Sequence, residues 1–240
     1  MIFNRMIRKL VLILLIALGL LLQGSQSALH ALELSPGGLI PVSLPMGYSR
    51  VSPVLKADLD GDGTLESLEL AGKRLSIVSA GTTAWQSPND WQVTQAAVGD
   101  LNLDGQPEVI LLLWRPFRPW PVDQWLPNGG RISAFHDRQG LSCHIILVGW
   151  RGAGYHELWA GSPMADPIYS FAVADLDGDQ NQELVAVEGR YNESRSRPAR
   201  TLKVWKWNGF GFSVVSSMDG IFNEFTLIKA NNDHILILVP

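Results

Sequence analysis

Three short acidic segments repeat one pattern of oxygen-bearing side chains along the chain. They run from Asp58 to Glu66, from Asp100 to Glu108 and from Asp175 to Glu183, and are called here the first, second and third loops. Each carries aspartate or asparagine at positions 1, 3 and 5 and glutamate at position 9. Ca²⁺ is a hard cation that takes six to eight oxygen ligands at about 2.3–2.6 Å. The pattern therefore predicts one calcium ion in each loop.

The predicted ligands are the side chains at positions 1, 3, 5 and 9 and the backbone carbonyl at position 7. They are Asp58, Asp60, Asp62, Thr64 and Glu66 in the first loop, Asp100, Asn102, Asp104, Gln106 and Glu108 in the second, and Asp175, Asp177, Asp179, Asn181 and Glu183 in the third. Glycines at positions 4 and 6 let the first loop curl around an ion. Because Leu103 and Gln180 each replace one of these glycines, weaker binding is expected in the second and third loops.

Two other interpretations of the loops were weighed. Metal-free turns are disfavoured, because four acceptors in so small a loop repel one another unless a cation neutralises them. An EF-hand or dockerin loop fits the first segment, which has Glu69 at position 12, but the same position holds Leu111 and Ala186 in the other two. Val51 and Pro53 are also poor residues for an entering helix.

The loops join β-strands. Runs rich in β-formers precede them at Val51–Leu55, Val93–Val98 and Tyr169–Val173, and others follow at Leu68–Leu70, Val109–Leu113 and Leu184–Val187. The chain has 240 residues, of which 46% are hydrophobic, which is enough for one sizeable core. Repetition of a strand–loop–strand unit then predicts an all-β repeat fold.

The repeated motifs resemble a known family. They are Ala174–Asp179 followed by Glu183–Val185, the segment Pro107–Ile110, and the later segment Val204–Gly209. On these motifs, residues 50–240 resemble the FG-GAP or VCBS repeat β-propellers, of which the integrin α-subunit head is the familiar member. The resemblance implies calcium loops between the first and second strands of each blade. It also implies a ligand-binding face at the opposite end, on the loops between second and third strands.

Four blades of four strands each are predicted. Residues 52–90, 92–163 and 168–216 supply one blade each, and the last blade combines Phe222–Lys229 and His234–Val239 with a strand from Leu32–Leu44. Five blades, or an open partial propeller that completes itself by dimerisation, are the alternatives. The predicted domains are residues 1–28 as a signal peptide or membrane anchor and 32–240 as the propeller.

An insertion at residues 115–142 interrupts the second blade. Its prolines alternate with aromatic residues and arginines, which excludes a helix and disfavours a paired strand. One hypothesis makes it a binding platform, since tryptophan and arginine are common hot-spot residues. Its predicted ligand-binding residues are Arg115, Phe117, Arg118, Trp120 and Trp125. The alternative is that the tryptophans fold back to cover the propeller. The basic segment Gly189–Arg200 is expected on the same face.

The N-terminal residues predict export. Arg5, Arg8 and Lys9 precede the apolar run Leu10–Leu22, which is shorter than the roughly 20 residues that span a bilayer, and a small, polar stretch ends at Ala28. A secreted, periplasmic or outer-surface location is predicted, with membrane contact only if the segment is uncleaved. The single cysteine, Cys143, excludes an intrachain disulfide and is expected to be a buried thiol.

A calcium-binding adhesion module for a protein or glycan is the predicted function. The net charge of −4 and scattered arginines exclude a nucleic-acid partner, whereas a homo-oligomer is left open. No catalytic motif is found, so an enzyme is not expected. A structural or assembly subunit of a cell-envelope complex is one alternative, and a secreted hydrolase, with Asp123 and Asp137 as an acid/base pair, is another.

Overall fold

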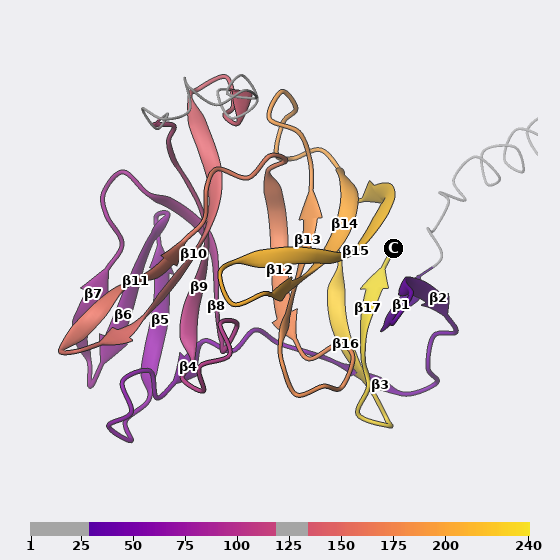
Figure 1. The fold of residues 1–240 in the computed structure, drawn as a ribbon, viewed down its shortest axis with the longest axis horizontal. Coiled ribbons are helices and arrows are strands. Elements are labelled where there is room, and N and C mark those ends of the chain that lie inside the picture. Colours follow the sequence, from indigo (N-terminus) through magenta and orange to yellow (C-terminus); the bar gives the residue numbers. More distant parts are fainter. Residues whose placement is uncertain (1–28, 119–133) are drawn as a thin grey trace, which may run out of the picture.

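The computed structural model describes residues 29–118 and 134–240, and these form a four-bladed β-propeller of antiparallel sheets (Figure 1). Three blades have four strands each, in sequential order. Blade 1 contains β4 (Lys56–Ala57), β5 (Glu66–Ala71), β6 (Arg74–Ser79) and β7 (Thr82–Gln86); blade 2 contains β8 (Gln92–Gly99), β9 (Glu108–Pro116), β10 (Leu141–Arg151) and β11 (Gly154–Ala160); blade 3 contains β12 (Ile168–Ala174), β13 (Glu183–Glu188), β14 (Ala199–Trp207) and β15 (Phe212–Phe222). The predicted fold class is confirmed.

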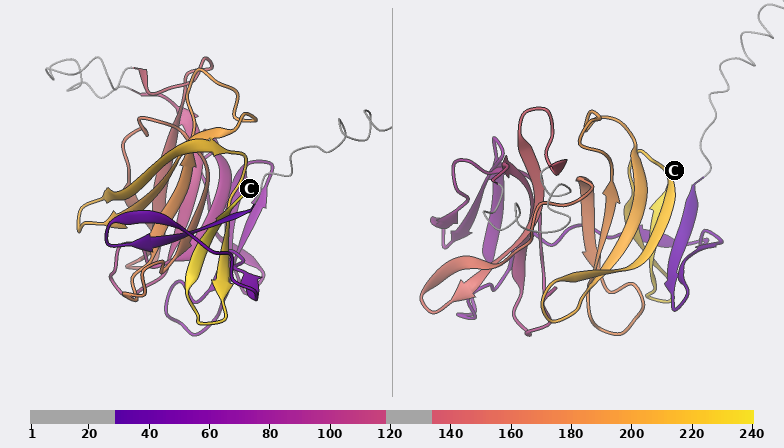
Figure 2. Two further views of the ribbon diagram at one scale, coloured as in Figure 1. Left: turned by 90° about the vertical axis from the view of Figure 1, so that its right-hand side faces the viewer. Right: turned by 45° about the horizontal axis from the view of Figure 1, so that its top comes forward.

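Blade 4 is built from segments distant in sequence. Its strand order is β3 (Tyr48–Arg50), β16 (Thr226–Ala230), β17 (Ile235–Val239), β1 (His30–Ser35) and β2 (Gly38–Val42). Strand β1 pairs with β17 through His30–Val239 and Leu32–Ile237, and Figure 2 shows these indigo and yellow strands side by side. The expected contribution of residues 32–44 to this blade is therefore observed. The blade has five strands, because residues 30–42 supply two strands where one was expected and β3 also joins it.

Three hydrophobic cores lie between successive blades. They centre on Leu75, Ile77, Val109 and Leu111 between blades 1 and 2, on Ile110, Leu112, Ile145 and Phe171 between blades 2 and 3, and on Val185, Val204, Leu227 and Ile237 between blades 3 and 4. Strand β9 is buried on both faces from Glu108 to Trp114, since a blade packs against each side of its sheet. This explains why its sequence is a continuous apolar run without alternation.

The segment Val51–Leu55 connects blade 4 to blade 1 along the inner strands. The Val51 N–H donates to the Leu227 carbonyl of blade 4 at 2.9 Å, and the Val54 carbonyl accepts from Val98 of blade 2 at 2.9 Å. A cavity of about 470 Å³ lies beside this segment and is lined by inner strands β8, β12 and β16. None of the hydrophobic clusters among the described residues joins blade 4 directly to blade 1.

Strand β9 ends later than predicted. Arg115 and Pro116 belong to it and pair with Ser142 and Leu141, so the prediction of an unpaired loop from residue 115 is wrong for these two positions. Strand β8 begins at Gln92, opposite Trp114, and leaves the β8 side of the sheet vacant beyond that point. Pro116 is therefore tolerated, because its missing N–H would have faced no partner strand.

Candidate functional site

The three acidic loops lie at one end of the propeller, here called the metal end. They connect β4 to β5, β8 to β9 and β12 to β13, which are the first and second strands of their blades (Figure 1). The connections β9–β10 and β13–β14 lie at the other end, here called the loop face. This arrangement agrees with the expectation drawn from the resemblance.

The loops share one backbone shape. Positions 4 and 6 have positive φ in each of them: Gly61 and Gly63 at 77° and 87°, Leu103 and Gly105 at 64° and 86°, and Gly178 and Gln180 at 77° and 71°. Left-handed backbone costs roughly 1–2 kcal/mol for a residue with a Cβ. Leu103 and Gln180 therefore hold the shape of the first loop against an intrinsic preference.

The aspartate at position 1 closes each loop through backbone hydrogen bonds. Asp58 accepts from the N–H groups of Gly61 and Gly63 at 2.8 and 2.9 Å. Asp100 accepts from Asp104 and Gly105 at 3.2 and 2.9 Å, and Asp175 accepts from Gly178 and Gln180 at 2.7 and 2.9 Å. These bonds hold the carboxylate in place and point the remaining acceptors of the loop toward a common centre.

The glutamate at position 9 is buried in all three loops. Glu66, Glu108 and Glu183 are 0%, 1% and 0% exposed. One oxygen of each accepts the backbone N–H of the residue at position 2, namely Leu59 at 2.8 Å, Leu101 at 3.3 Å and Leu176 at 2.7 Å. The second oxygen of each glutamate, Oε1, does not take part in this backbone hydrogen bond and is available to a side chain or an ion in the loop.

Carboxylate oxygens come together in each loop closely enough to hold a metal ion. The groups whose oxygens lie within 4.8 Å of one another are Asp58, Asp60 and Asp62; Asp100, Asp104 and Glu108; and Asp175, Asp177 and Glu183. Glu66 and Asp179 do not belong to these groups, although both were predicted as ligands. The N–H groups of Thr64, Gln106 and Asn181 donate to the position-5 aspartate, and metal binding by their carbonyls stays a prediction.

The strand opposite the glutamate differs in chemistry between blades. One register step beyond the last paired residues, Ser79 lies opposite Glu66, Gly149 opposite Glu108 and Lys206 opposite Glu183. The Ser79 hydroxyl donates to Glu66 Oε1 at 2.9 Å, and the Lys206 ammonium lies 3.2 Å from Glu183 Oε1. Gly149 has no side chain to offer, and a Cβ there would lie 3.4 Å from Glu108 Cγ.

Glu108 is consequently the least compensated of the three glutamates. The Oε1 atoms of Glu108 and Glu183 are both buried without a hydrogen-bond partner among the described residues, but Glu183 has the Lys206 ammonium at 3.2 Å whereas Glu108 forms no salt bridge with any described residue. Burial, followed by the charges of Asp104 and Asp100, raises the pKa of Glu108 to about 8. A buried oxygen without a partner beside two more carboxylates fits a bound cation, and an all-oxygen donor set suits Ca²⁺, Mg²⁺ or Mn²⁺ better than a soft metal.

The second and third loops touch each other. The Asp100 N–H donates to Gln182 Oε1 at 3.0 Å, so a side chain of the third loop orders the start of the second. Gly99 makes this approach feasible, because a Cβ at that position would lie 2.4 Å from the same oxygen. The second and third loops are therefore in direct contact, even though the residues that could bind a cation differ between them.

The described residues of the predicted binding platform are anchored to the propeller. Arg115 lies over the Trp91 ring at 5.9 Å, Phe117 packs on His136 with ring centroids 5.2 Å apart, and Arg118 pairs with Asp90 at 3.2 Å. Trp120 and Trp125 lie outside the described residues, as does Asp123.

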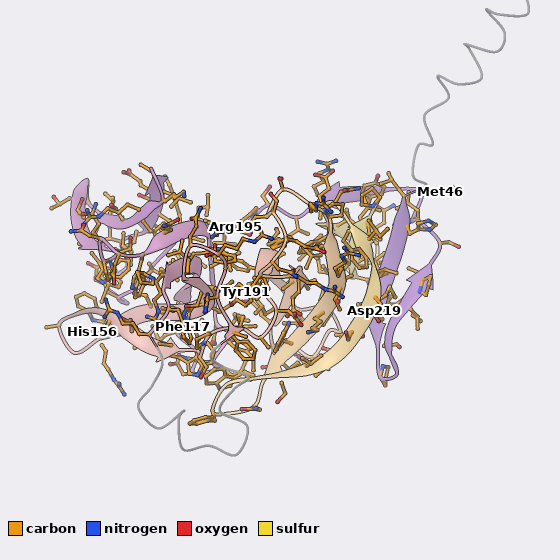
Figure 3. The ribbon with its side chains drawn as sticks, turned by 90° about the horizontal axis from the view of Figure 1, so that it is seen from above. Met46, Phe117, His156, Tyr191, Arg195 and Asp219 are labelled. Carbon is orange, nitrogen blue, oxygen red and sulfur yellow. The ribbon has the colours of Figure 1, made fainter. Side chains whose placement is uncertain are left out.

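The two connections of the loop face meet through one arginine. Arg195, from the β13–β14 connection, pairs with Asp137 at 2.8 Å and lies over the Trp114 ring at 3.4 Å. Tyr191 packs edge-on against Trp114 with centroids 5.7 Å apart, and Figure 3, which looks onto this end, shows Arg195, Tyr191 and Phe117 in the same part of the face. Asp137 also caps a turn through Gln139 and Leu141, so its carboxylate is fully engaged.

A cavity of about 390 Å³ opens at this end between Trp91, Arg115, Arg118, His144 and Glu157. Its lining includes a buried serine–histidine pair, Ser142 and His144, that the sequence analysis did not identify. Ser142 Oγ lies 2.8 Å from His144 Nε2, and His144 Nδ1 lies 3.0 Å from the Gly161 carbonyl. The two side chains are 1% and 3% exposed, which fits a buried structural pair. Their i, i+2 spacing on one strand was the available signal.

Cys143 is buried between blades 2 and 3, as expected. Burial raises the pKa of its thiol to about 12, so it is an apolar core group rather than a nucleophile. Within the described residues, the model contains no helix with the length and apolarity needed to cross a membrane.

No family model, curated protein or solved structure matches the chain. Membership of the FG-GAP or VCBS repeats therefore stays a prediction from the motifs.

Proposed function

We propose that this chain is an exported β-propeller that calcium stabilises at the metal end and that binds an acidic protein segment at the loop face. The separation of charge between the two ends carries this proposal. Carboxylates gather in the three loops of the metal end. Arginines gather at the other end: Arg115, Arg118, Arg138, Arg190, Arg195, Arg197 and Arg200. The two ends therefore suit ligands of opposite charge.

Calcium at the first and second loops is supported by the donor sets and by Glu108. The side chains offer only oxygen atoms, in a loop that already has its closed shape from backbone hydrogen bonds. An ion at the second loop would compensate the buried Glu108 Oε1, which has no hydrogen-bond partner among the described residues. Ca²⁺ is favoured over Mg²⁺ because backbone carbonyls and several carboxylates suit its larger, more variable coordination shell. Bound there, calcium would supply charge neutralisation and link the strand ends.

The arginines that remain unpaired favour an acidic partner. Arg118, Arg195 and Arg200 form salt bridges with Asp90, Asp137 and Glu193. Arg138, Arg190 and Arg197 are exposed and form no salt bridge with any carboxylate of residues 29–118 or 134–240. Guanidinium groups bind carboxylates through paired hydrogen bonds. The half-buried Phe117 adds aromatic surface at the same face, which is typical of protein-binding sites.

Export is part of the proposal because of the N-terminal sequence. A basic start, an apolar run and a small-residue end precede the propeller. Calcium loops of moderate affinity also function where the cation is abundant, as it is outside the cytosol. A secreted, periplasmic or outer-surface protein with an adhesive function satisfies both features.

Charge reversal at the loop face tests the binding function. The test variant carries Arg138→Glu, Arg190→Glu and Arg197→Glu, and the probe is a synthetic polyglutamate peptide measured by fluorescence anisotropy. We expect the wild-type chain to bind the peptide in a salt-dependent way and the variant to lose about tenfold or more in affinity. The control variant carries Arg50→Glu, Arg151→Glu and Lys229→Glu, which are exposed, lie away from the loop face and change the net charge equally.

Equal weakening in both variants would show a general charge effect and refute a specific loop face. Binding of heparin without binding of the peptide would assign the face to an acidic glycan instead. Neither ligand binding to the wild-type chain would remove the proposed function at this end.

A second candidate, assembly into an envelope complex, is favoured by one outer strand. Strand β15 exposes Val214, Val215 and Ile221, the last with 72% of its surface accessible. An exposed outer strand with apolar side chains can pair with another chain. Replacing Val214 and Ile221 with lysine would then abolish assembly measured by sedimentation, while the loop-face variant would leave assembly intact.

A further inference from the structure

The third loop already contains a cation that belongs to the protein. Lys206 extends from β14, and its Nζ lies 2.7 Å from Asp177 Oδ2, 2.7 Å from Asp179 Oδ2 and 3.2 Å from Glu183 Oε1. Asp177 and Glu183 are members of the carboxylate group that could hold a metal ion in this loop. The ammonium therefore lies among the oxygens that an ion would need.

The other two loops have no such group. The register that places Lys206 opposite Glu183 places Ser79 opposite Glu66 and Gly149 opposite Glu108. Among the described residues, no lysine or arginine forms a salt bridge with a carboxylate of the first or second loop. The three loops share their backbone shape and their position-1 and position-9 acids. They differ in the residue that faces the position-9 glutamate from the third strand.

A lysine ammonium and a calcium ion exclude each other at such a centre. Both would contact the same carboxylate oxygens, and two cations within a few ångströms repel one another strongly where solvent is partly excluded. The lysine has the advantage of being tethered, because β13 and β14 are paired up to Leu184 and Trp205, next to the contact, and its arrival costs no loss of translational freedom. It also donates hydrogen bonds to Asp177 and Asp179 and places its charge 3.2 Å from Glu183 Oε1.

We propose that Lys206 is a built-in cation that closes the third loop in place of a metal, so that the chain binds two calcium ions, at the first and second loops. The number two rests on the proposed function, whereas the exclusion of metal from the third loop rests on the Lys206 contacts. The residue opposite the position-9 glutamate then determines whether a loop of this shape requires an ion. This departs from the sequence-based expectation of three ions.

The test counts calcium ions by isothermal titration of the purified full chain. The test variant is Lys206→Ser, which gives blade 3 the residue that blade 1 has at this register. We expect two ions in the wild-type chain and three in the variant. The matched control is Lys229→Ser, which removes a lysine from an exposed pair with Asp233 and is expected to leave two ions.

Three further variants locate the sites and cover the case in which Lys206→Ser does not fold. Asp100→Asn is expected to reduce the wild-type count from two to one, whereas Asp175→Asn is expected to leave it at two. The reciprocal variant Ser79→Lys brings an ammonium to Glu66 in the first loop and is expected to reduce the count to one.

The outcomes separate this inference from the proposed function. Three ions in the wild-type chain, with one lost in Asp175→Asn, would overturn the inference and leave calcium binding intact. A folded Lys206→Ser variant that still binds two ions would also overturn it. No ion in the wild-type chain but one in Lys206→Ser would refute calcium binding at the first two loops while supporting the inference.

Discussion

The second and third loops have the same backbone and different neighbours. Both carry left-handed residues at positions 4 and 6, both close on a position-1 aspartate, and both bury a glutamate under the loop. In the second loop that glutamate faces Gly149 and keeps an oxygen without a partner. In the third it faces Lys206. A loop motif thus sets where acceptors converge, and the adjoining strand sets which side chain faces them.

Removal of calcium is the largest expected perturbation of this comparison. A site held at a free calcium concentration 100-fold above its Kd adds about 2.7 kcal/mol to the free energy of unfolding, so two sites add about 5 kcal/mol. We expect chelation to lower the Tm by about 10–20 °C for a chain of this size, with little recovery in Mg²⁺. Circular dichroism during heating measures this. An unchanged Tm would show that the first and second loops need no ion.

The next largest expected effect is a loss of stability at low pH, which arises from His144 in blade 2. It must be measured separately from the effect of metal binding. Burial, and then the charge of Arg115, lowers the pKa of His144 from 6.5 to about 4. Between these values the unfolded chain binds a proton that the folded chain does not, so stability is complete above about pH 6.5 and falls as pH approaches 4. The loss is on the order of 3 kcal/mol.

Denaturant unfolding at saturating calcium between pH 4 and 7 measures the His144 effect. The variant His144→Gln keeps hydrogen-bonding capacity without the titration and is expected to flatten the profile in this range. A profile that keeps its slope in His144→Gln would assign the pH effect to other groups, such as the loop carboxylates. Comparisons of the loops are therefore best made at pH 7 or above.

Removal of the Lys206 ammonium tests directly how much this group stabilises the third loop. In chelator, Lys206→Met leaves Asp177, Asp179 and Glu183 without a cation, and we expect a loss of about 2 kcal/mol in the free energy of unfolding. The value is below that for a fully buried pair because Lys206 is partly exposed. Addition of calcium should restore this loss in the variant. Equal stability of the variant and the wild-type chain in chelator would indicate that the lysine contacts contribute little.

Backbone strain gives the smallest expected effect. Leu103 occupies a position where the other two loops have Gly61 and Gly178, and its φ of 64° is unfavourable for a residue with a Cβ. Leu103→Gly is expected to raise stability by up to about 1 kcal/mol, while Leu103→Ala should not. Urea unfolding of both variants measures this. Equal stability of the glycine and alanine variants would show that the left-handed backbone stores no strain here.

Much of the metal end could be predicted from local sequence. The aspartates at positions 1, 3 and 5, the glutamate at position 9 and the flanking β-formers all lie within about ten residues of one another, and local spacing determines how a short loop folds. The blade order followed for the same reason, since consecutive strands form hairpins. The start of the insertion was misplaced, because Arg115 and Pro116 pair with β10 after the neighbouring strand β8 has ended.

The residues themselves determined the all-β fold, the three acidic loops and the buried state of Cys143, because each depends on composition or on spacing along one segment. The tertiary structure alone decided that β1 joins β17, that Arg195 links the two connections of the loop face, and that Ser79, Gly149 and Lys206 lie opposite the three glutamates. The last set brings a lysine ammonium to the third loop and a hydroxyl to the first. It depends on strand register across 13 to 41 residues of chain, and no local pattern of the loops encodes what the opposite strand will bring.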